Sequence, residues 1–169
     1  MSLVIGKNEF DSGVVNSANP SLGAASPTSF RLGGFEFTQT TLNADLVRDL
    51  ELGGSGPLTF AYGAEFRVEE YETSAGDPAS FQAGPVIAAI GAQAGPGLPT
   101  GSEADVDRNV FSLYVDVETD LTEQFSIGAA ARYEDYDDFG DALTGKLSAR
   151  FQVTDAFAIR AAAGTNFRA

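Results

Sequence analysis

The chain has 169 residues, contains no cysteine, histidine or tryptophan, and carries 24 acidic against 10 basic side chains, for a formal net charge of -14. The missing thiols and imidazoles exclude disulfides, cysteine-ligated metal sites and histidine-dependent catalysis, and nucleic acid repels so negative a chain. We therefore expect one ordinary domain that is not an enzyme and that holds no cofactor or metal ion.

Apolar and polar residues alternate in seven segments, and a period of two is typical of β-strands. The alternation is weakest in the first segment, where Asn8 shares a face with Phe10. It is regular in the third segment and in the last four, and in the best of these every charge falls on one face. The expected strands lie near residues 4–17, 35–48, 58–71, 109–120, 125–136, 142–153 and 157–168.

The connections between the expected strands differ in length. The short ones lie near 48–57, 121–124 and 154–156, and the others near 18–34, 72–108 and 137–141. The longest, 72–108, is rich in glycine, proline and alanine, and we expect its apolar run 86–90 to form a short helix or to pack on the sheet. Because successive connections of an antiparallel meander lie at opposite edges, one edge collects short turns and the other large loops. This asymmetry is typical of outer-membrane β-barrels.

Each expected strand has an apolar and a polar face, as do half-buried sheets in water and transmembrane barrels. The strands are about a dozen residues long, whereas ordinary strands have about five or six and about nine to eleven residues cross a bilayer. We therefore expect the apolar face to meet lipid and the polar face to line a lumen. The candidate lumen-facing side chains are Glu65, Arg67, Asp116, Glu118, Arg132, Glu134, Lys146, Arg150, Arg160 and Arg168. For any single pair among them, a weak solvated surface contact is the more ordinary interpretation.

Four motifs in the last third of the chain are specific enough to compare with known proteins. They are S-L-Y-V-D-V-E-T-D-L-T at 112–122, A-R-Y-E-D-Y-D-D-F-G at 131–140, K-L-S-A-R-F at 146–151 and G-T-N-F-R-A at 164–169. The second resembles the hairpin R-Y-x-D-Y-x-D-F-G of TonB-dependent outer-membrane receptors. The fourth resembles their G-T-G-F-R-A, with Asn166 in place of a glycine. Weaker similarity upstream includes F-A-Y-G-A-E-F-R at 60–67, so the resemblance covers most of the chain.

The expected fold is all-β: an antiparallel up-and-down meander of about seven long strands that forms part of a transmembrane β-barrel. The resemblance implies active uptake of a scarce nutrient, such as a ferric siderophore, cobalamin or a carbohydrate, across the outer membrane of a Gram-negative bacterium. Its implied partners are TonB, a nutrient ligand and a plug domain inside a barrel of about 22 strands. We find no plug and no TonB box, and an odd number of strands cannot close a bacterial barrel. We therefore expect residues 1–169 to be a single partial segment of a longer receptor.

Two other classes of function are compatible with these patterns. One is a self-contained soluble β-barrel or sandwich that binds a ligand or a partner. The other is a different outer-membrane barrel that acts as an adhesin or a pore. If residues 1–169 form an open sheet, its first and last strands are unpaired edges and one face is apolar, so the isolated chain must curl into a small barrel, pair with another copy or aggregate in water. We expect self-association.

Overall fold

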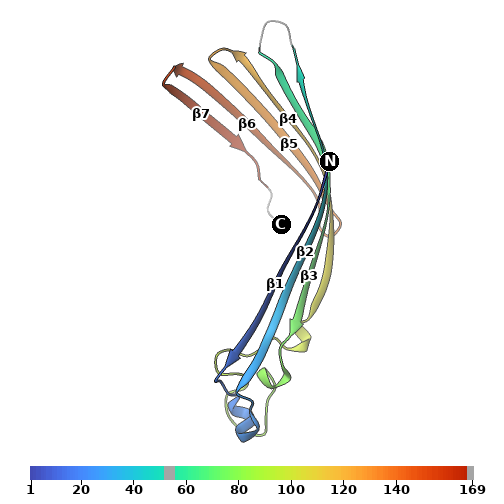
Figure 1. The fold of residues 1–169 in the computed structure, drawn as a ribbon, viewed down its shortest axis with the longest axis vertical. Coiled ribbons are helices and arrows are strands. Elements are labelled where there is room, and N and C mark those ends of the chain that lie inside the picture. Colours follow the sequence, from blue (N-terminus) through green and yellow to red (C-terminus); the bar gives the residue numbers. More distant parts are fainter. Residues whose placement is uncertain (52–55, 167–169) are drawn as a thin grey trace. The chain divides into compact units, whose positions relative to one another are not determined.

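The computed structural model describes residues 1–51 and 56–166, most of which lie in β-strands (Figure 1). Seven strands form one sheet, and neighbours in the sheet follow the order of the chain. They are β1 (Ser2–Val15), β2 (Ser29–Leu50), β3 (Leu58–Ala75), β4 (Ala104–Thr122), β5 (Phe125–Tyr136), β6 (Gly140–Thr154) and β7 (Phe157–Gly164). The expected all-β antiparallel meander of seven long strands is confirmed. Among the described residues, no helix combines the length and the apolar character that a membrane span requires.

The strands differ from the expected ones mainly in length. β5 has the expected bounds, whereas β2 begins at Ser29, β3 continues to Ala75 and β4 begins at Ala104. The long connection therefore covers 76–103 instead of 72–108. Polar contacts between distant residues explain the difference, because the Thr73 hydroxyl donates to the Ser102 carbonyl (2.8 Å) and accepts from the Ala104 N–H (2.7 Å). The alternation of apolar and polar residues along the sequence does not reveal contacts between residues so far apart in the chain.

Three short 3-10 helices lie in the long connections: η1 (Pro20–Ala25), η2 (Pro78–Ser80) and η3 (Thr100–Ser102). The helix expected within 86–90 is absent, since this run forms bends and Ile87 is fully exposed. Gly91, at a φ of +90°, follows the run directly in a conformation that an α-helix cannot continue through. The run thus presents apolar side chains at the surface.

The chain divides into two compact units that share the long strands. Unit 1 comprises residues 1–4, 40–68 and 108–169, and unit 2 comprises residues 5–39 and 69–107. Within unit 1, the tight turns at 123–124 and 155–156 lie at one end and the hairpin turn 137–139 at the other (Figure 1). Within unit 2, the three 3-10 helices lie together beyond the strand ends (Figure 1). Each unit therefore has its own candidate functional region.

The register of β4 to β7 assigns the side chains of unit 1 to two faces. Ala129 pairs with Leu147, which pairs with Ala163, and the next row joins Ala130 to Lys146. Since successive residues of a strand point to opposite faces, Ile127, Leu147 and Ile159 share what we call the apolar face. What we call the polar face carries Arg132, Arg150 and Arg160.

Little of the apolar face is covered within the chain. Leu143 and Leu147 are 72% and 65% exposed, and Ile159 is 54% exposed. The buried apolar cluster of unit 1, formed by Val110, Tyr136 and Ala142, lies on the polar face instead. A bare apolar face of this extent requires a medium or a partner other than water.

Candidate functional site

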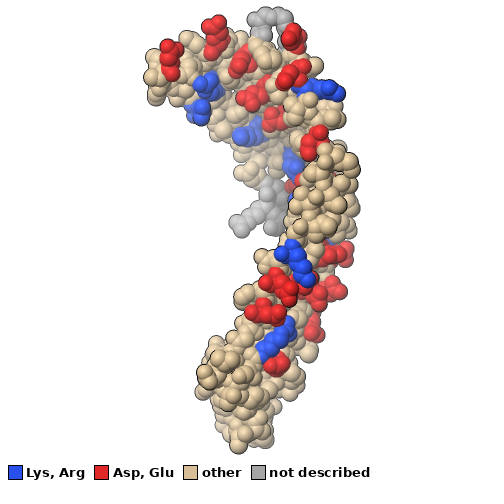
Figure 2. Space-filling model, in the orientation of Figure 1, with Lys and Arg blue, Asp and Glu red and all other residues tan. Residues whose placement is uncertain are grey.

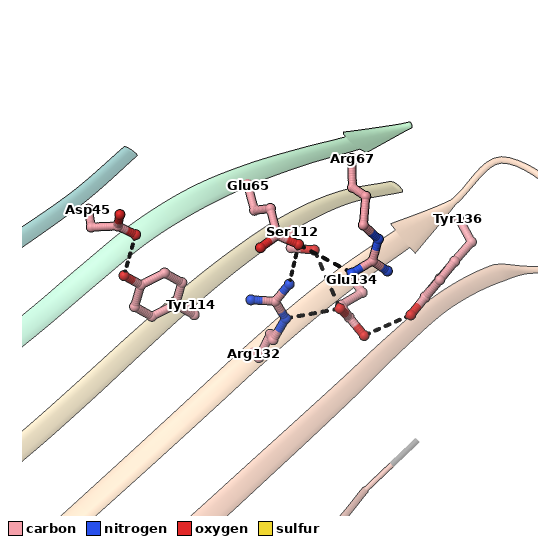
Figure 3. A network of polar contacts seen from close by, with 8 residues as sticks. All are labelled: Asp45, Glu65, Arg67, Ser112, Tyr114, Arg132, Glu134 and Tyr136. Atoms are coloured by element: carbon pink, nitrogen blue, oxygen red, sulfur yellow. Dashed lines mark hydrogen bonds and ion pairs between the residues drawn. The ribbon is translucent and has the colours of Figure 1, made fainter. Parts of the chain in front are cut away.

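An ion-pair network lies on the polar face of unit 1, with Arg132 of β5 at its centre (Figure 3). The Arg132 guanidinium contacts the Glu65 carboxylate through Nη2 and the Glu134 carboxylate through Nε, each at 2.9 Å. Arg67 reaches the same Glu65 oxygen at 3.4 Å. We call Glu65, Arg67, Arg132 and Glu134 the ion-pair network; it joins β3 to β5 across β4. Their side chains are 15–31% exposed, so the charges stay partly hydrated.

Neutral hydroxyl groups extend the network at its edge. The Tyr136 hydroxyl donates to Glu134 Oε2 at 2.9 Å, and the Ser112 hydroxyl, fully buried, lies 3.5 Å from Glu134 Oε1. Glu134 thereby accepts from three side chains. A carboxylate held in this way is stabilised in its charged form and fixed in one orientation.

A second contact on this face depends on a glycine. The Tyr114 hydroxyl donates to Asp45 Oδ1 of β2 at 2.7 Å (Figure 3). The Tyr114 ring lies over Gly63, where a Cβ atom would come within 2.6 Å of Tyr114 Cε1 and 2.7 Å of the Ala44 carbonyl oxygen. Only glycine leaves room for the ring to cross β3 and reach Asp45.

The hairpin turn 137–139 is held on β4 by two further contacts. Asp137 accepts from the Asn109 side chain (2.8 Å) and from the Asn109 N–H (3.0 Å), and these hydrogen bonds hold the pKa of Asp137 below its ordinary value. The Arg108 guanidinium pairs with Asp138 (2.7 Å) and lies 5.2 Å from the centre of the Phe139 ring. The turn therefore has one defined position.

A comparison with known protein families shows which family has this architecture. A family model described as "TonB dependent receptor-like, beta-barrel" matches residues 5–169. The chain belongs to this family. No curated protein and no solved structure matches it. Family membership makes the chain a barrel segment of an outer-membrane receptor, with the Gram-negative outer membrane as the location of the whole protein.

The geometry gives the residues of the receptor-like motif at 132–140 separate structural tasks. Arg132 and Glu134 form the ion-pair network, and Tyr136 donates to Glu134 while its ring stacks on Phe139 with centroids 4.2 Å apart. Gly140 adopts a φ of +101°, which closes the turn and disfavours any other residue. The motif therefore encodes the end of the β5–β6 hairpin and its attachment to the neighbouring strands.

The structure brings together four of the ten candidate lumen-facing residues. Glu65, Arg67, Arg132 and Glu134 form the ion-pair network. Five others share the polar face without joining it: Asp116, Glu118, Lys146, Arg150 and Arg160. Asp116 and Lys146 lie in the same row of the sheet with Ala130 of β5 between them, and no ion pair joins them in the described part of the chain. Arg168 lies outside the described residues.

Sequence reasoning missed three residues of this face: Asp45, Ser112 and Tyr114. Ser112 and Tyr114 alternate in phase with Asp116, so their position was available from periodicity. Asp45 lies in the expected strand 35–48, but only the pairing of β2 with β3 shows that it can meet Tyr114. Acidic and basic side chains also lie close together elsewhere on the surface drawn in Figure 2.

The polar face of unit 1 is concave over β4 to β7. An open hollow of about 640 Å³ runs over it, and its lining includes Tyr114, Asp116, Arg132, Thr144 and Lys146. Among the described residues, no three acidic side chains are close enough together to hold a metal ion. The lining offers hydrogen-bond donors and charges of both signs.

The connections of unit 2 form a second region, the loop cluster (residues 16–28 and 76–103). Its centre is Asn19, fully buried, whose side-chain NH2 donates to the carbonyls of Ala79 and Gln82, each at 2.8 Å. The Asn19 side-chain oxygen accepts from the Ser21 N–H (3.1 Å) and hydroxyl (2.7 Å). All four hydrogen-bonding positions of the amide are thus used.

Backbone hydrogen bonds complete the loop cluster. The N–H groups of Val86 and Gln93 donate to the carbonyls of Ser21 and Ala18, at 3.0 and 3.1 Å. Ser80, also fully buried, accepts through its carbonyl oxygen from Ala92. The two connections therefore form one folded surface. No charged residue occurs in 12–30 or 78–102, which matches the uncharged surface at the lower end of Figure 2.

Proposed function

We propose that this chain forms part of the wall of a receptor that takes up a scarce nutrient, with a ferric siderophore as the substrate. In this proposal, residues 1–169 are a single partial barrel segment, the apolar face meets lipid and the polar face lines the lumen. The observation that carries it is the separation of the faces, with Leu147 bare on one and the ion-pair network on the other. TonB and a plug domain act as partners.

The loop cluster supports a role in binding the nutrient. In barrels of this kind, the longer connections are extracellular. Asn19 and Ser80 hold both connections in one folded arrangement, so a ligand need not order them and binding avoids that entropic cost. The exposed Val86, Ile87 and Ile90 offer apolar contacts. Such a surface suits a compact ligand of low charge.

The charges around the loop cluster narrow the class of siderophore. Unit 2 carries ten carboxylates and two basic side chains, all outside the uncharged stretches. A field of this sign repels anions and attracts cations. We therefore propose a neutral or cationic ferric siderophore, such as a ferric hydroxamate, as the substrate.

Growth on defined nutrient sources tests this proposal. A strain without the receptor is complemented with the full-length protein and grown with ferric hydroxamates, anionic ferric catecholates, cobalamin or a carbohydrate as the limiting nutrient. We expect rescue by a hydroxamate that disappears when TonB is deleted. Rescue independent of TonB, or rescue only by cobalamin, a carbohydrate or a catecholate, contradicts the proposal.

The isolated chain provides a separate test of the open sheet. With β1 and β7 unpaired at the edges and the apolar face bare, we expect self-association. Light scattering of the refolded chain in detergent-free buffer measures it. A compact monomer contradicts this part of the proposal.

A further inference from the structure

One stretch of the loop cluster, residues 83–92, exposes apolar side chains without interruption, and we call it the apolar segment. Its sequence is A-G-P-V-I-A-A-I-G-A, so none of its side chains can donate or accept a hydrogen bond. Every residue from Pro85 to Ile90 is exposed, and Ile87 is fully exposed. Contiguous exposed apolar surface of this kind is typical of a binding site.

Both ends of the apolar segment are fastened to the rest of the loop cluster. The Val86 N–H donates to the Ser21 carbonyl at 3.0 Å, and the Val86 side chain lies beside Gly23, where a Cβ atom would come within 3.1 Å of Val86 Cγ2. At the other end, the Ala92 N–H donates to the Ser80 carbonyl at 3.0 Å. A ligand that binds the exposed side chains between these anchors therefore has little backbone to order.

The composition of the apolar segment favours an alkyl chain over a protein surface as its ligand. A protein interface of standard size carries about ten hydrogen bonds, and the side chains of this segment can form none. An alkyl chain needs apolar contact alone, and its contact with such side chains is favourable because it removes hydrocarbon from water.

The charges of unit 2 restrict which alkyl chain can bind. Its ten carboxylates, against two basic side chains, repel an amphiphile with an anionic headgroup, such as a fatty acid or an anionic phospholipid. The charged residues nearest to the apolar segment along the chain, Asp77 and Glu103, are both acidic. An alkyl chain attached to a neutral or cationic group is compatible with both the segment and these charges.

We propose that the apolar segment binds an alkyl chain carried by the substrate, so that the receptor takes up an acylated ferric hydroxamate. This inference rests on the proposed function, because it takes a neutral or cationic ferric hydroxamate as the substrate. Ile87 and Ile90 contact the alkyl chain, and the chelated iron group lies elsewhere on the loop cluster. The length of the alkyl chain then determines affinity at constant charge.

Binding of two matched chelates to whole cells tests the proposal. Cells that lack other hydroxamate receptors produce the full-length receptor and are depleted of energy, so the measurement reports binding without uptake. The probes are ferric complexes of desferrioxamine B whose amine carries an acetyl or an octanoyl group, so both are neutral and differ only in chain length. Cells without the receptor give the background of nonspecific membrane binding. We expect the octanoyl complex to bind about tenfold more tightly, because each buried methylene group contributes about fourfold.

Substitution of the two isoleucines supplies the second readout. Ile87→Ser with Ile90→Ser should weaken binding of the octanoyl complex about tenfold and leave that of the acetyl complex within about twofold. Since both side chains are exposed, unchanged binding of the acetyl complex also shows that the variant is folded. Val106→Ser, at an exposed position of β4 outside the loop cluster, is the matched control and should change neither affinity.

The outcomes separate this inference from the proposed function. Equal binding of the two complexes by the wild type, or a preference for the octanoyl complex that persists in the double variant, overturns the inference and leaves hydroxamate uptake standing. An equal loss of both complexes in the double variant also overturns it. Binding of neither complex by the wild type contradicts the proposed function as well. A fluorophore at position 88 that brominated lipid quenches in the absence of ligand would show that the apolar segment lies on the membrane instead.

Discussion

The loop cluster and the ion-pair network both depend on a polar side chain that joins two segments of the chain, but these side chains differ in charge and burial. Asn19 is neutral and fully buried, with every hydrogen-bonding position used. Arg132 is charged, and its side chain is 31% exposed. A satisfied neutral amide can be buried at modest cost, whereas charges taken out of water lose more than an ion pair returns. The buried, neutral Asn19 amide therefore holds the loop cluster together, and the partly hydrated charges of the ion-pair network connect β3 to β5.

This difference predicts that substitution of Asn19 destabilises its region of the molecule more than substitution of Arg132 does. Asn19→Ala removes the donors to the carbonyls of Ala79 and Gln82 and empties a fully buried position, at about 2–4 kcal/mol for the loop cluster. Hydrogen exchange measured by mass spectrometry should show faster exchange of the Val86 and Gln93 amides. Asn8→Ala, at an exposed position of β1, is the control and should change neither. Equal exchange in both variants would show that Asn19 does not hold the cluster.

Removal of the Arg132 guanidinium should reduce stability by a smaller amount. Arg132→Met leaves the Glu65 and Glu134 carboxylates close together without their shared cation, at about 1–2 kcal/mol because water screens part of the repulsion. The urea midpoint of the receptor in detergent micelles measures this loss, which added salt should reduce. Lys146→Met, on the same face and outside the network, is the control. An equal shift in both variants would contradict a specific role for Arg132.

The contact of Tyr114 with Gly63 tests whether packing on the polar face is as specific as its charges. Gly63→Ala places a Cβ against the Tyr114 ring and should cost about 1–2 kcal/mol. In a double-mutant cycle, the cost should fall in the Tyr114→Ala background, where the ring is absent. Strict additivity of the two substitutions would argue against the contact.

The smallest expected effect is a loss of stability of the hairpin turn 137–139 at low pH. Hydrogen bonds from Asn109 lower the pKa of Asp137, so they stabilise the hairpin turn above the ordinary aspartate range, and this contribution is lost as the pH falls through the lowered pKa. A titration followed by the Asp137 carboxyl carbon in NMR measures the effect. Asn109→Ala should move the midpoint upward towards the ordinary value. The same midpoint in both proteins would exclude Asn109 as the cause.

Local alternation was sufficient to predict what depends on neighbouring residues. It predicts the bounds of β5 and the separation of Ile127 from Arg132, because the period of a strand is set by its own backbone. It does not predict the start of β2 or the burial of Asn19, whose partners lie about 60 residues away in the chain. It also groups ten charges on one face without showing that Arg132 reaches Glu65 while Arg150 reaches no carboxylate among the described residues.

The central claim is that the two faces of the same strands meet different media, and fluorescence quenching along β6 tests it most directly. Residues 1–169 contain no cysteine, so single cysteines at 146, 147, 148 and 149 can each carry a fluorophore once any cysteine elsewhere in the full-length receptor is replaced by serine, before refolding into bilayers of brominated lipid. We predict strong quenching at Leu147 and Ala149 and weak quenching at Lys146 and Ser148. Equal quenching at all four positions, or the opposite alternation, would contradict the account.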